Sequence, residues 1–213
     1  MKRIKILLVL LTAVPSMLVA QADNLLRNPS FEYGASAPGM LPAKWFSCGD
    51  LGNSPPDLHN DLRQHFFEIQ ADASEGIQFV SMVSRADGTT ECIGQKLKKP
   101  LLAGETYQLT IHLSQDPYFT AHIKNKSTPV PFDKPVVVEV YIKTASGEVR
   151  LLGDTQAIDH PEWRAYQFEF TPDELVTEVR IGPYFSIQYF ESYYGHVLLD
   201  EVVLEKVSGF AKE

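Results

Sequence analysis

Aromatic side chains beside polar residues are the feature of this sequence with the clearest chemical use. Flat apolar rings can bind the C–H faces of sugar rings while polar neighbours pair with hydroxyl groups, provided that the rings are exposed and rigidly held. Three groups qualify: Tyr118 with Phe119, Tyr141 between Glu139 and Lys143, and a cluster at 184–194 that includes Tyr184, Tyr189 and Tyr193. We expect these rings to contribute to ligand binding.

The cluster at 184–194 is unusually aromatic, with six such residues in eleven positions. Most of them could instead pack beneath their own loop, so we expect only one or two to reach a ligand. A polar row of Gln108, Thr110 and His112 would lie beside Tyr141 if the two strands pair. This makes His112 a further candidate for ligand binding.

Catalytic patterns are scarce. The six histidines show no H-E-x-x-H or Cys/His metal spacing, and there is no G-x-S-x-G motif. His59, Asp61 and His65 could form a metal cluster in a loop, although solvated loop residues are the simpler interpretation. Glu139 and Glu169 could act as a glycosidase pair only at a separation that the sequence does not give. We expect no enzyme, with a small polysaccharide-acting enzyme as the remote alternative.

The first 22 residues have the pattern of a secretory signal peptide. A basic tip at 2–5 precedes an apolar stretch at 6–20, and Ala20 and Ala22 have the spacing of a cleavage site. A transmembrane anchor would need about 20 unbroken apolar residues, whereas Pro15 interrupts this stretch. We expect cleavage after Ala22, no membrane-spanning segment, and a protein that is secreted, periplasmic or at the cell surface.

Export would change the charge and the state of the cysteines. The segment carries 3 of the 19 basic residues and none of the 27 acidic ones, so its removal changes the net charge from −8 to 16 − 27 = −11. Such a chain is a poor partner for nucleic acid.

Cys48 and Cys92 could form a disulfide in an oxidising compartment, worth roughly 3 to 4 kcal/mol, or remain two buried thiols.

Short alternating segments between glycines and prolines indicate an all-β chain. We expect strands near 25–32, 66–70, 77–83, 92–97, 105–113, 136–143, 149–154, 163–170, 178–183 and 196–207. Several alternate apolar and polar residues, as in Tyr107–Ser114, which is typical of strands with one buried face. The sequence therefore predicts one domain at 23–213, an antiparallel two-sheet β-sandwich, with two long loops at Gly34–Leu62 and Gln115–Pro135.

Several motifs, in their order and spacing, resemble a known superfamily. They are Asn24-Leu-Leu-Arg-Asn-Pro-Ser-Phe-Glu32, Trp45, Glu91-Cys-Ile-Gly-Gln-Lys-Leu97, Pro100-Leu-Leu-Ala-Gly-Glu-Thr-Tyr107, Trp163-Arg-Ala-Tyr-Gln-Phe-Glu-Phe-Thr-Pro172 and Leu199-Asp-Glu-Val202. Together they resemble the galactose-binding-like jelly rolls, which include many carbohydrate-binding modules. They are most similar to the "NPSFE" surface modules of secreted bacterial proteins, often found in Bacteroidetes. The resemblance implies a jelly-roll sandwich.

The resemblance also implies a structural calcium ion where the first and last strands meet. The matching carboxylates are Glu32 and Asp200, and calcium prefers six to eight oxygen ligands. Glu201 departs from the family pattern, in which a second Asp is common. The alternative is that Glu32 accepts backbone N–H bonds and Asp200 makes a turn.

Together, these observations favour an exported, non-catalytic module that binds glycan at the cell surface or outside the cell. The alternative is a structural or protein-interaction module of the bacterial cell envelope, because interface cores are also rich in Tyr and Phe. The expected partner is therefore a glycan or an envelope protein.

Overall fold

The computed structural model describes residues 23–49, 55–63, 65–123, 126–185 and 193–207. In this part of the chain there are twelve strands and no helix. None of the described residues belongs to a helix that is long and apolar enough to cross a membrane. The expected signal peptide at 1–22 lies outside the described residues.

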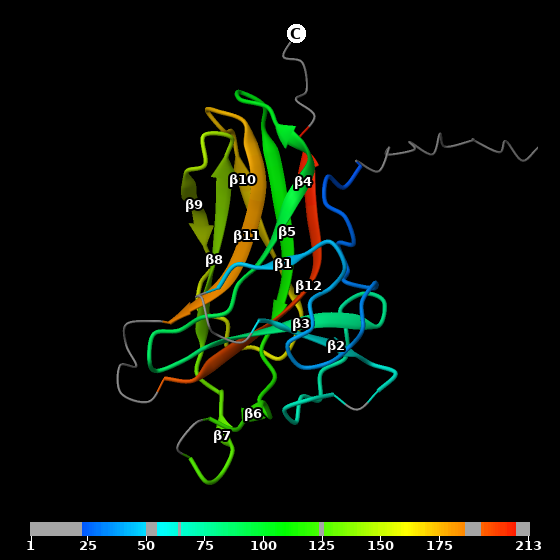
Figure 1. The fold of residues 1–213 in the computed structure, drawn as a ribbon, viewed down its shortest axis with the longest axis vertical. Helices are drawn as coiled ribbons and strands as arrows, with labels where there is room; N and C mark the ends of the chain where they lie inside the picture. The colour runs from blue at the N-terminus through cyan, green and yellow to red at the C-terminus, as the bar shows by residue number, and fades with distance from the viewer. Residues whose placement is uncertain (1–22, 50–54, 64, 124–125, 186–192, 208–213) are drawn as a thin grey trace, which may run out of the picture.

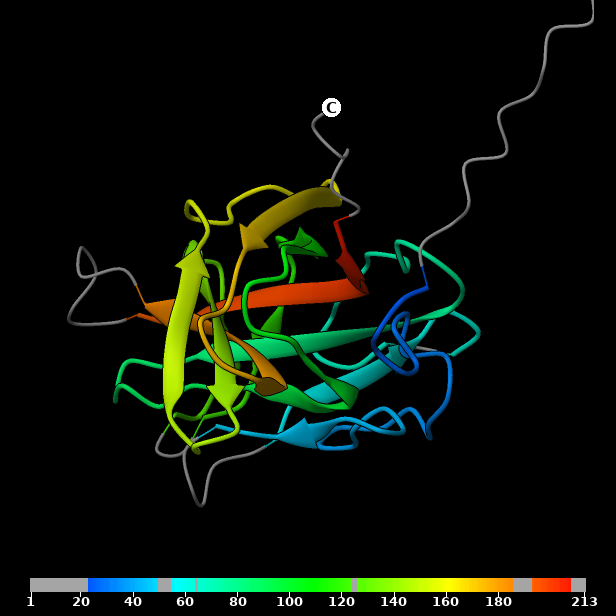
Figure 2. The same cartoon turned by 90° about the horizontal axis from the view of Figure 1, so that it is seen from above.

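Ten of the strands form two five-stranded antiparallel sheets, drawn from two directions in Figures 1 and 2. We call the first the open sheet; its order is β1 (Phe46–Ser47), β4 (Ile93–Leu101), β11 (Val176–Phe185), β8 (Val136–Thr144) and β9 (Val149–Asp154). We call the second the covered sheet; its order is β10 (Arg164–Phe170), β5 (Tyr107–Ser114), β12 (Gly195–Lys206), β3 (Gln78–Ser84) and β2 (Asp57–Asn60). The hairpin of β6 (Thr120–Ala121) and β7 (Val130–Pro131) projects at one end (Figure 1).

The main hydrophobic core lies between the two sheets and follows from strand alternation. Leu109, Ile111 and Leu113 of β5 are fully buried, and so are Val138 and Val140 of β8. Successive side chains of a strand point to opposite faces, so these residues fill the space between the sheets. Each such side chain contributes about 1.5 to 3 kcal/mol on burial. The expected all-β antiparallel sandwich is confirmed.

A second hydrophobic cluster lies on the outer face of the covered sheet. Its buried members are Phe79, Val83 and Leu198 from the sheet, and Ile69, Phe119 and Phe132 from loops. The loop segments are joined to one another by backbone bonds, such as Thr120 N to Phe67 O at 2.9 Å. The long loop predicted at Gln115–Pro135 therefore covers this sheet with a second apolar layer.

Eight of the ten predicted strands are confirmed, and those near 25–32 and 66–70 are wrong. The first fails because Asn28 and Phe31 have φ values of 49° and 60°, which a strand does not permit. The Asn28 side chain donates to Tyr33 O at 3.2 Å and to Ala43 O at 3.1 Å, which folds the segment back on itself. The second fails because Phe67 and Glu68 both have φ values of 61°.

The predicted disulfide is confirmed. Cys48 and Cys92 are bonded, with their Cα atoms 4.8 Å apart. The bond joins the segment after β1 to the segment before β4, where Cys48 N also donates to Cys92 O at 2.9 Å. The covalent link and the backbone bond together fix the edge of the open sheet.

Candidate functional site

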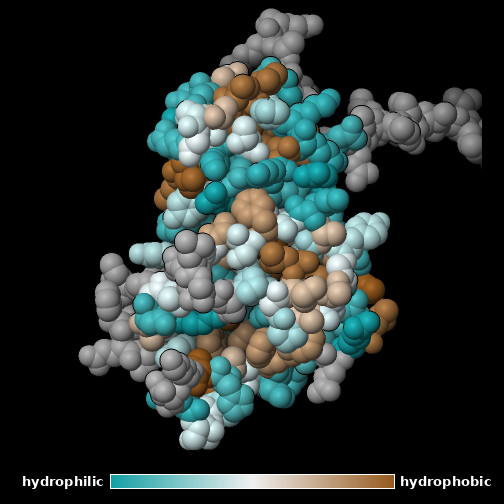
Figure 3. Space-filling model, viewed as in Figure 1, coloured by the Kyte–Doolittle hydropathy of each residue, from teal (hydrophilic) through white to brown (hydrophobic). Residues whose placement is uncertain are grey.

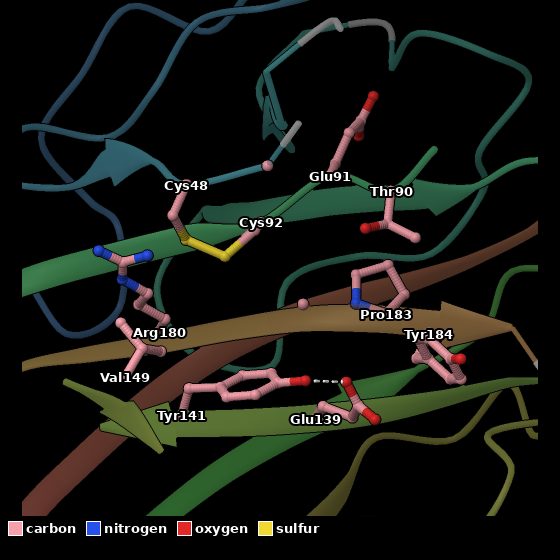
Figure 4. A pocket seen from close by; sticks show the side chains of 12 residues that line it. Cys48, Thr90, Glu91, Cys92, Glu139, Tyr141, Val149, Arg180, Pro183 and Tyr184 are labelled. Atoms are coloured by element: carbon pink, nitrogen blue, oxygen red, sulfur yellow. Dashed lines mark hydrogen bonds between the residues drawn. A yellow bond between two sulfur atoms is a disulfide. The ribbon is translucent and has the colours of Figure 1, made fainter. Parts of the chain in front are cut away.

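A hollow of about 270 Å³ lies on the outer face of the open sheet. Figure 4 shows Tyr141 and Glu139 on β8, Arg180 and Tyr184 on β11, and the disulfide above them. The outer faces of β8 and β11 form its floor, because their alternate residues fill the core on the other side. On the face seen in Figure 1, hydrophobic residues are interspersed with hydrophilic ones (Figure 3).

Two tyrosines place their rings in this hollow. Tyr184 is 45% exposed and Tyr141 is partly exposed. The register sets Tyr141 opposite Arg180 and Glu139 opposite Gly182, so Tyr184 lies two positions further along β11 on the same face. The structure therefore brings together Tyr141 and Tyr184 from two of the three predicted aromatic groups.

The Tyr141 hydroxyl donates a hydrogen bond to the Glu139 carboxylate, drawn as the dashed line in Figure 4. Desolvation, this bond and the nearby Glu139 charge raise the pKa of Tyr141 to about 12. The phenol therefore remains protonated at neutral pH, and its ring is fixed at both ends, by β8 and by the carboxylate. A fixed, partly exposed ring of this kind suits stacking on a flat ligand.

Gly182 is required for the shape of the hollow. A Cβ atom at this position would lie 2.8 Å from Glu91 O and 3.3 Å from Cys92 Cβ. The missing side chain lets the disulfide segment pack directly on β11 and leaves open space beside Glu139.

The polar side of the hollow continues along the same face. Arg180 Nε donates to Glu178 Oε1 at 2.6 Å, and Glu178 lies in register with Lys143 on one side and Lys96 on the other. Glu178, Lys143 and Lys96 line a second hollow of about 430 Å³. The seven residues from Glu178 to Tyr184 span about 20 Å of strand. Aromatic rings and charged groups therefore follow one another along the whole of this strand face.

The other predicted binding residues lie elsewhere. Tyr118 is 53% exposed, but it belongs to the loop over the covered sheet and does not line the hollow. Phe119 and Tyr193 are only 2% and 1% exposed, so the expectation that they are exposed is wrong. Phe119 stacks on Phe67 in the second cluster, and the Tyr193 hydroxyl donates to Pro135 O. Tyr189 lies outside the described residues.

His112 is also separated from Tyr141. Its strand, β5, pairs with β10 and β12, whereas β8 pairs with β9 and β11, so the proposed neighbourhood is wrong. The His112 side chain instead lies 3.2 Å from the Glu201 carboxylate. The same topology places Glu139 and Glu169 in different sheets, and they do not form a catalytic pair.

The possible metal cluster of His59, Asp61 and His65 is not supported, and the preferred interpretation of solvated loop residues does not hold for His59. His59 is fully buried and stacks on Phe79, and His65 Nε2 lies 3.3 Å from Asp61 Oδ1. Burial and the neighbouring His65 lower the pKa of His59 to about 3, so its ring is neutral. Within the described ranges, no group of three or more His, Cys, Asp or Glu residues could hold a metal ion.

Glu32 and Asp200 do meet at one place, the turn at residues 74–78. Glu32 Oε1 accepts the Ile77 and Gln78 N–H groups at 2.9 and 3.0 Å. Asp200 Oδ2 accepts two further N–H groups of this turn, each at 2.9 Å, and Oδ1 accepts the Glu201 N–H at 2.6 Å. Calcium needs oxygen ligands, whereas five N–H donors point at these carboxylates. The bonds to Glu32 match the alternative in which this residue accepts backbone N–H groups. Calcium binding stays a prediction that a thermal melt with a chelator can test.

Three residues that line the hollow and were not predicted, Arg180, Gly182 and Pro183, belong to β11. Arg180 and Gly182 alternate with the buried Val179 and Ile181, so the strand pattern indicates that they lie on the outer face. Their position beside Tyr141 depends on the β8–β11 pairing, which the sequence does not state.

No protein-family model matches this chain, and no curated protein sequence matches it. Many solved structures are similar to it in fold, and three of them illustrate the likeness. An arabinose-bound α-L-arabinofuranosidase has a TM-score of 0.51 at 13% identity, covering 88% of this chain and 27% of its own. The enzymatically active domain of tailspike protein 4 from bacteriophage CBA120 has a TM-score of 0.50 at 11% identity, covering 86% of this chain and 21% of its own. A xylan-binding domain from Paenibacillus barcinonensis has a TM-score of 0.49 at 12% identity, covering 88% and 97%.

This chain therefore spans about a quarter or less of the first two of these proteins. At such identities the similarity concerns the fold alone, and it agrees with the expected jelly-roll sandwich.

Proposed function

We propose that this chain is an exported, non-catalytic module that binds glycan on the outer face of the open sheet. The observation that carries the proposal is the single hollow in which Tyr141 and Tyr184 lie beside Glu139 and Arg180. Rings that meet sugar C–H groups, next to a carboxylate and a guanidinium that pair with hydroxyls, form a typical polar and apolar combination for sugar recognition.

The length of the face favours an extended glycan over a single sugar. The first hollow is followed along β11 by the second one, lined by Lys96, Lys143 and Glu178. A chain of several sugars can contact both, whereas one ring can fill only one. We therefore expect affinity to rise with oligosaccharide length.

Two features support binding without catalysis as part of the proposal. Its carboxylate, Glu139, accepts the Tyr141 hydroxyl, whose pKa of about 12 keeps the proton in place. Glu169, the partner that a glycosidase pair would need, belongs to the other sheet. Export is supported by the sequence of residues 1–22 and by the Cys48–Cys92 disulfide, which requires an oxidising compartment.

Affinity gel electrophoresis against a panel of soluble polysaccharides, including xylan and β-1,4-galactan, tests the proposal. We expect at least one polymer to retard the wild-type chain. Tyr184→Ala should weaken that binding about tenfold, which corresponds to about 1.4 kcal/mol. Tyr33→Ala is the matched control, because Tyr33 is 72% exposed and does not line the hollow.

Two results would contradict the proposal: no retardation of a folded chain by any polymer, or equal weakening by Tyr184→Ala and Tyr33→Ala. Recovery of an envelope protein instead, lost in the Tyr184 variant, would favour the protein-interaction alternative.

A further inference from the structure

A second cavity, of about 340 Å³, lies at the β2–β3 edge of the covered sheet. Asp57 of β2 and Val83 of β3 face it from the sheet, and the two long loops close it from outside. It borders the first hollow at Glu91. The Glu91 backbone oxygen faces Gly182, whereas its side chain points away from the first hollow (Figure 4) and toward Arg85. The two cavities therefore present different chemistry.

One part of this cavity is apolar and aromatic. Phe67 and Phe119 are stacked with ring centroids 5.3 Å apart, and Phe132 lies at 5.3 Å from Phe119. Val83 and Ala121 also line this part. A sugar placed here would lose hydrogen bonds to water without finding partners, which is unfavourable for each buried hydroxyl group. An apolar ring would instead contact apolar side chains.

The other part is polar and has an excess of negative charge. Asp57 and Glu91 are only 7% and 2% exposed, and among the described residues that line the cavity Arg85 is the one Lys or Arg side chain. Arg85 pairs with Glu91 at 2.6 Å, while Asp57 Oδ1 accepts the Gly39 N–H at 2.6 Å. Among the described lining residues, the two carboxylates thus share a single guanidinium, which gives these three side chains a formal charge of −1.

Asp57 is incompletely compensated in this position. Burial raises its pKa to about 6, although the Gly39 N–H and Arg85 act in the opposite direction. A positively charged hydrogen-bond donor entering the cavity would supply the missing compensation.

We propose that this cavity is a second binding site, for a small amine that carries an aromatic or cycloaliphatic ring. The ring packs among Phe67, Phe119 and Phe132, and the ammonium group donates to Asp57. A volume of about 340 Å³ equals roughly ten water molecules, which suits a ring with a short arm. The site is independent of glycan binding on the open sheet, and either can fail without the other.

Calorimetric titration with three probes that differ only in their polar group tests the proposal on the full chain. The probes are 2-phenylethylamine, 2-phenylethanol and phenylacetate. We expect the amine to bind at least tenfold more tightly than the alcohol, and phenylacetate not to bind. Comparable binding of all three, or no binding of the amine to the folded chain, would overturn the proposal.

Two variants locate the binding. Asp57→Asn retains an oxygen that can accept the Gly39 N–H, and it should weaken the amine at least tenfold while leaving the alcohol unchanged. Ala121→Phe fills the apolar part and should abolish binding of both; it also decides the question if Asp57→Asn does not fold. Tyr141→Ala, in the first hollow, is the control and should change neither affinity. An amine affinity that both cavity variants leave intact, or that Tyr141→Ala removes, would refute the assignment.

Discussion

Both sheets of the sandwich carry aromatic residues on their outer faces, but these residues are partly exposed on the open sheet and buried on the covered sheet. On the open sheet, Tyr141 and Tyr184 remain partly exposed around a hollow. On the covered sheet, Phe79 meets Phe119 and Phe132 in a buried second layer that the loops complete. The comparison shows that an aromatic ring beside polar residues is equally compatible with a binding surface and with a core. Which one it becomes depends on whether a loop crosses the face.

The largest expected difference between the faces is in stability. Phe119→Ala should lower the free energy of unfolding by about 3 to 5 kcal/mol, because it empties a buried position. Tyr184→Ala should change it by less than about 1 kcal/mol, because the ring is 45% exposed. Urea denaturation of both variants measures this, and similar losses would remove the distinction between the faces.

The disulfide supports the open face, and its loss should have the next largest effect. Replacing both cysteines, Cys48→Ser with Cys92→Ser, should cost about 2 to 4 kcal/mol by releasing the loop between them. The double variant avoids a lone thiol. Its urea midpoint should match that of the reduced wild type, and a midpoint equal to that of the oxidised wild type would show that the bond does not constrain this edge.

Acid should destabilise the covered face through His196. Its Nδ1 donates to Phe132 O at 2.6 Å and its Nε2 accepts the Asp116 N–H at 3.0 Å, so a second proton would break a buried bond. Burial lowers the pKa of His196 from 6.5 to about 4. Below pH 6.5 the His196 imidazole takes up a proton in the unfolded chain but not in the folded chain. The free energy of unfolding therefore falls toward pH 4 and does not change above pH 6.5.

The measurement is the difference in unfolding free energy between wild type and His196→Gln at pH 7 and pH 4. At about 1.4 kcal/mol per pH unit, the wild type should lose about 2 to 3 kcal/mol more than the variant. The comparison with the variant is needed because the carboxyls of Asp57 and Asp200 have raised pKa values and also take up protons in the folded chain as the pH falls. This contribution is common to both proteins, so it cancels in the difference. A difference that does not change with pH would show that His196 is protonated in the folded chain.

Two hydroxyl deletions give the smallest expected effects. Tyr193→Phe removes a buried donor to Pro135 O and should cost about 1 to 3 kcal/mol, because the carbonyl loses its partner. Tyr141→Phe should cost less than about 1 kcal/mol, because water can reach Glu139 on the open face. Thermal unfolding of the two variants compares them directly, and the reverse order would contradict the assignment of the faces.

Much of the fold could be predicted because strand alternation is local. The apolar and polar alternation of β5 and β10 indicated which side chains face the core, and the structure agrees. The segment at 25–32 was also predicted to be a strand, but it bends because the Asn28 side chain bonds to Tyr33 and Ala43. Positive φ values at non-glycine residues leave no periodic trace in a sequence.

The candidate site could be predicted only in part, for a different reason. Tyr141 and Tyr184 were identified by residue type, but their meeting with Arg180 depends on the register of β8 with β11. The prediction for Phe119 was wrong because it rested on the neighbouring Tyr118 in a long loop, whereas the buried contacts of Phe119, such as Phe67, come from another loop. Pairings between distant segments follow from packing of the whole chain.

Hydroxyl-radical footprinting with the polysaccharide that retards the chain most strongly tests the central claim most directly. Mass spectrometry then reports which side chains the bound polymer protects. We predict protection of Tyr184, Tyr141 and the exposed Leu151 of β9, with unchanged oxidation of Tyr33 and Tyr118. Protection of Tyr118 with no change at Tyr184 would contradict the claim that the open sheet is the binding surface.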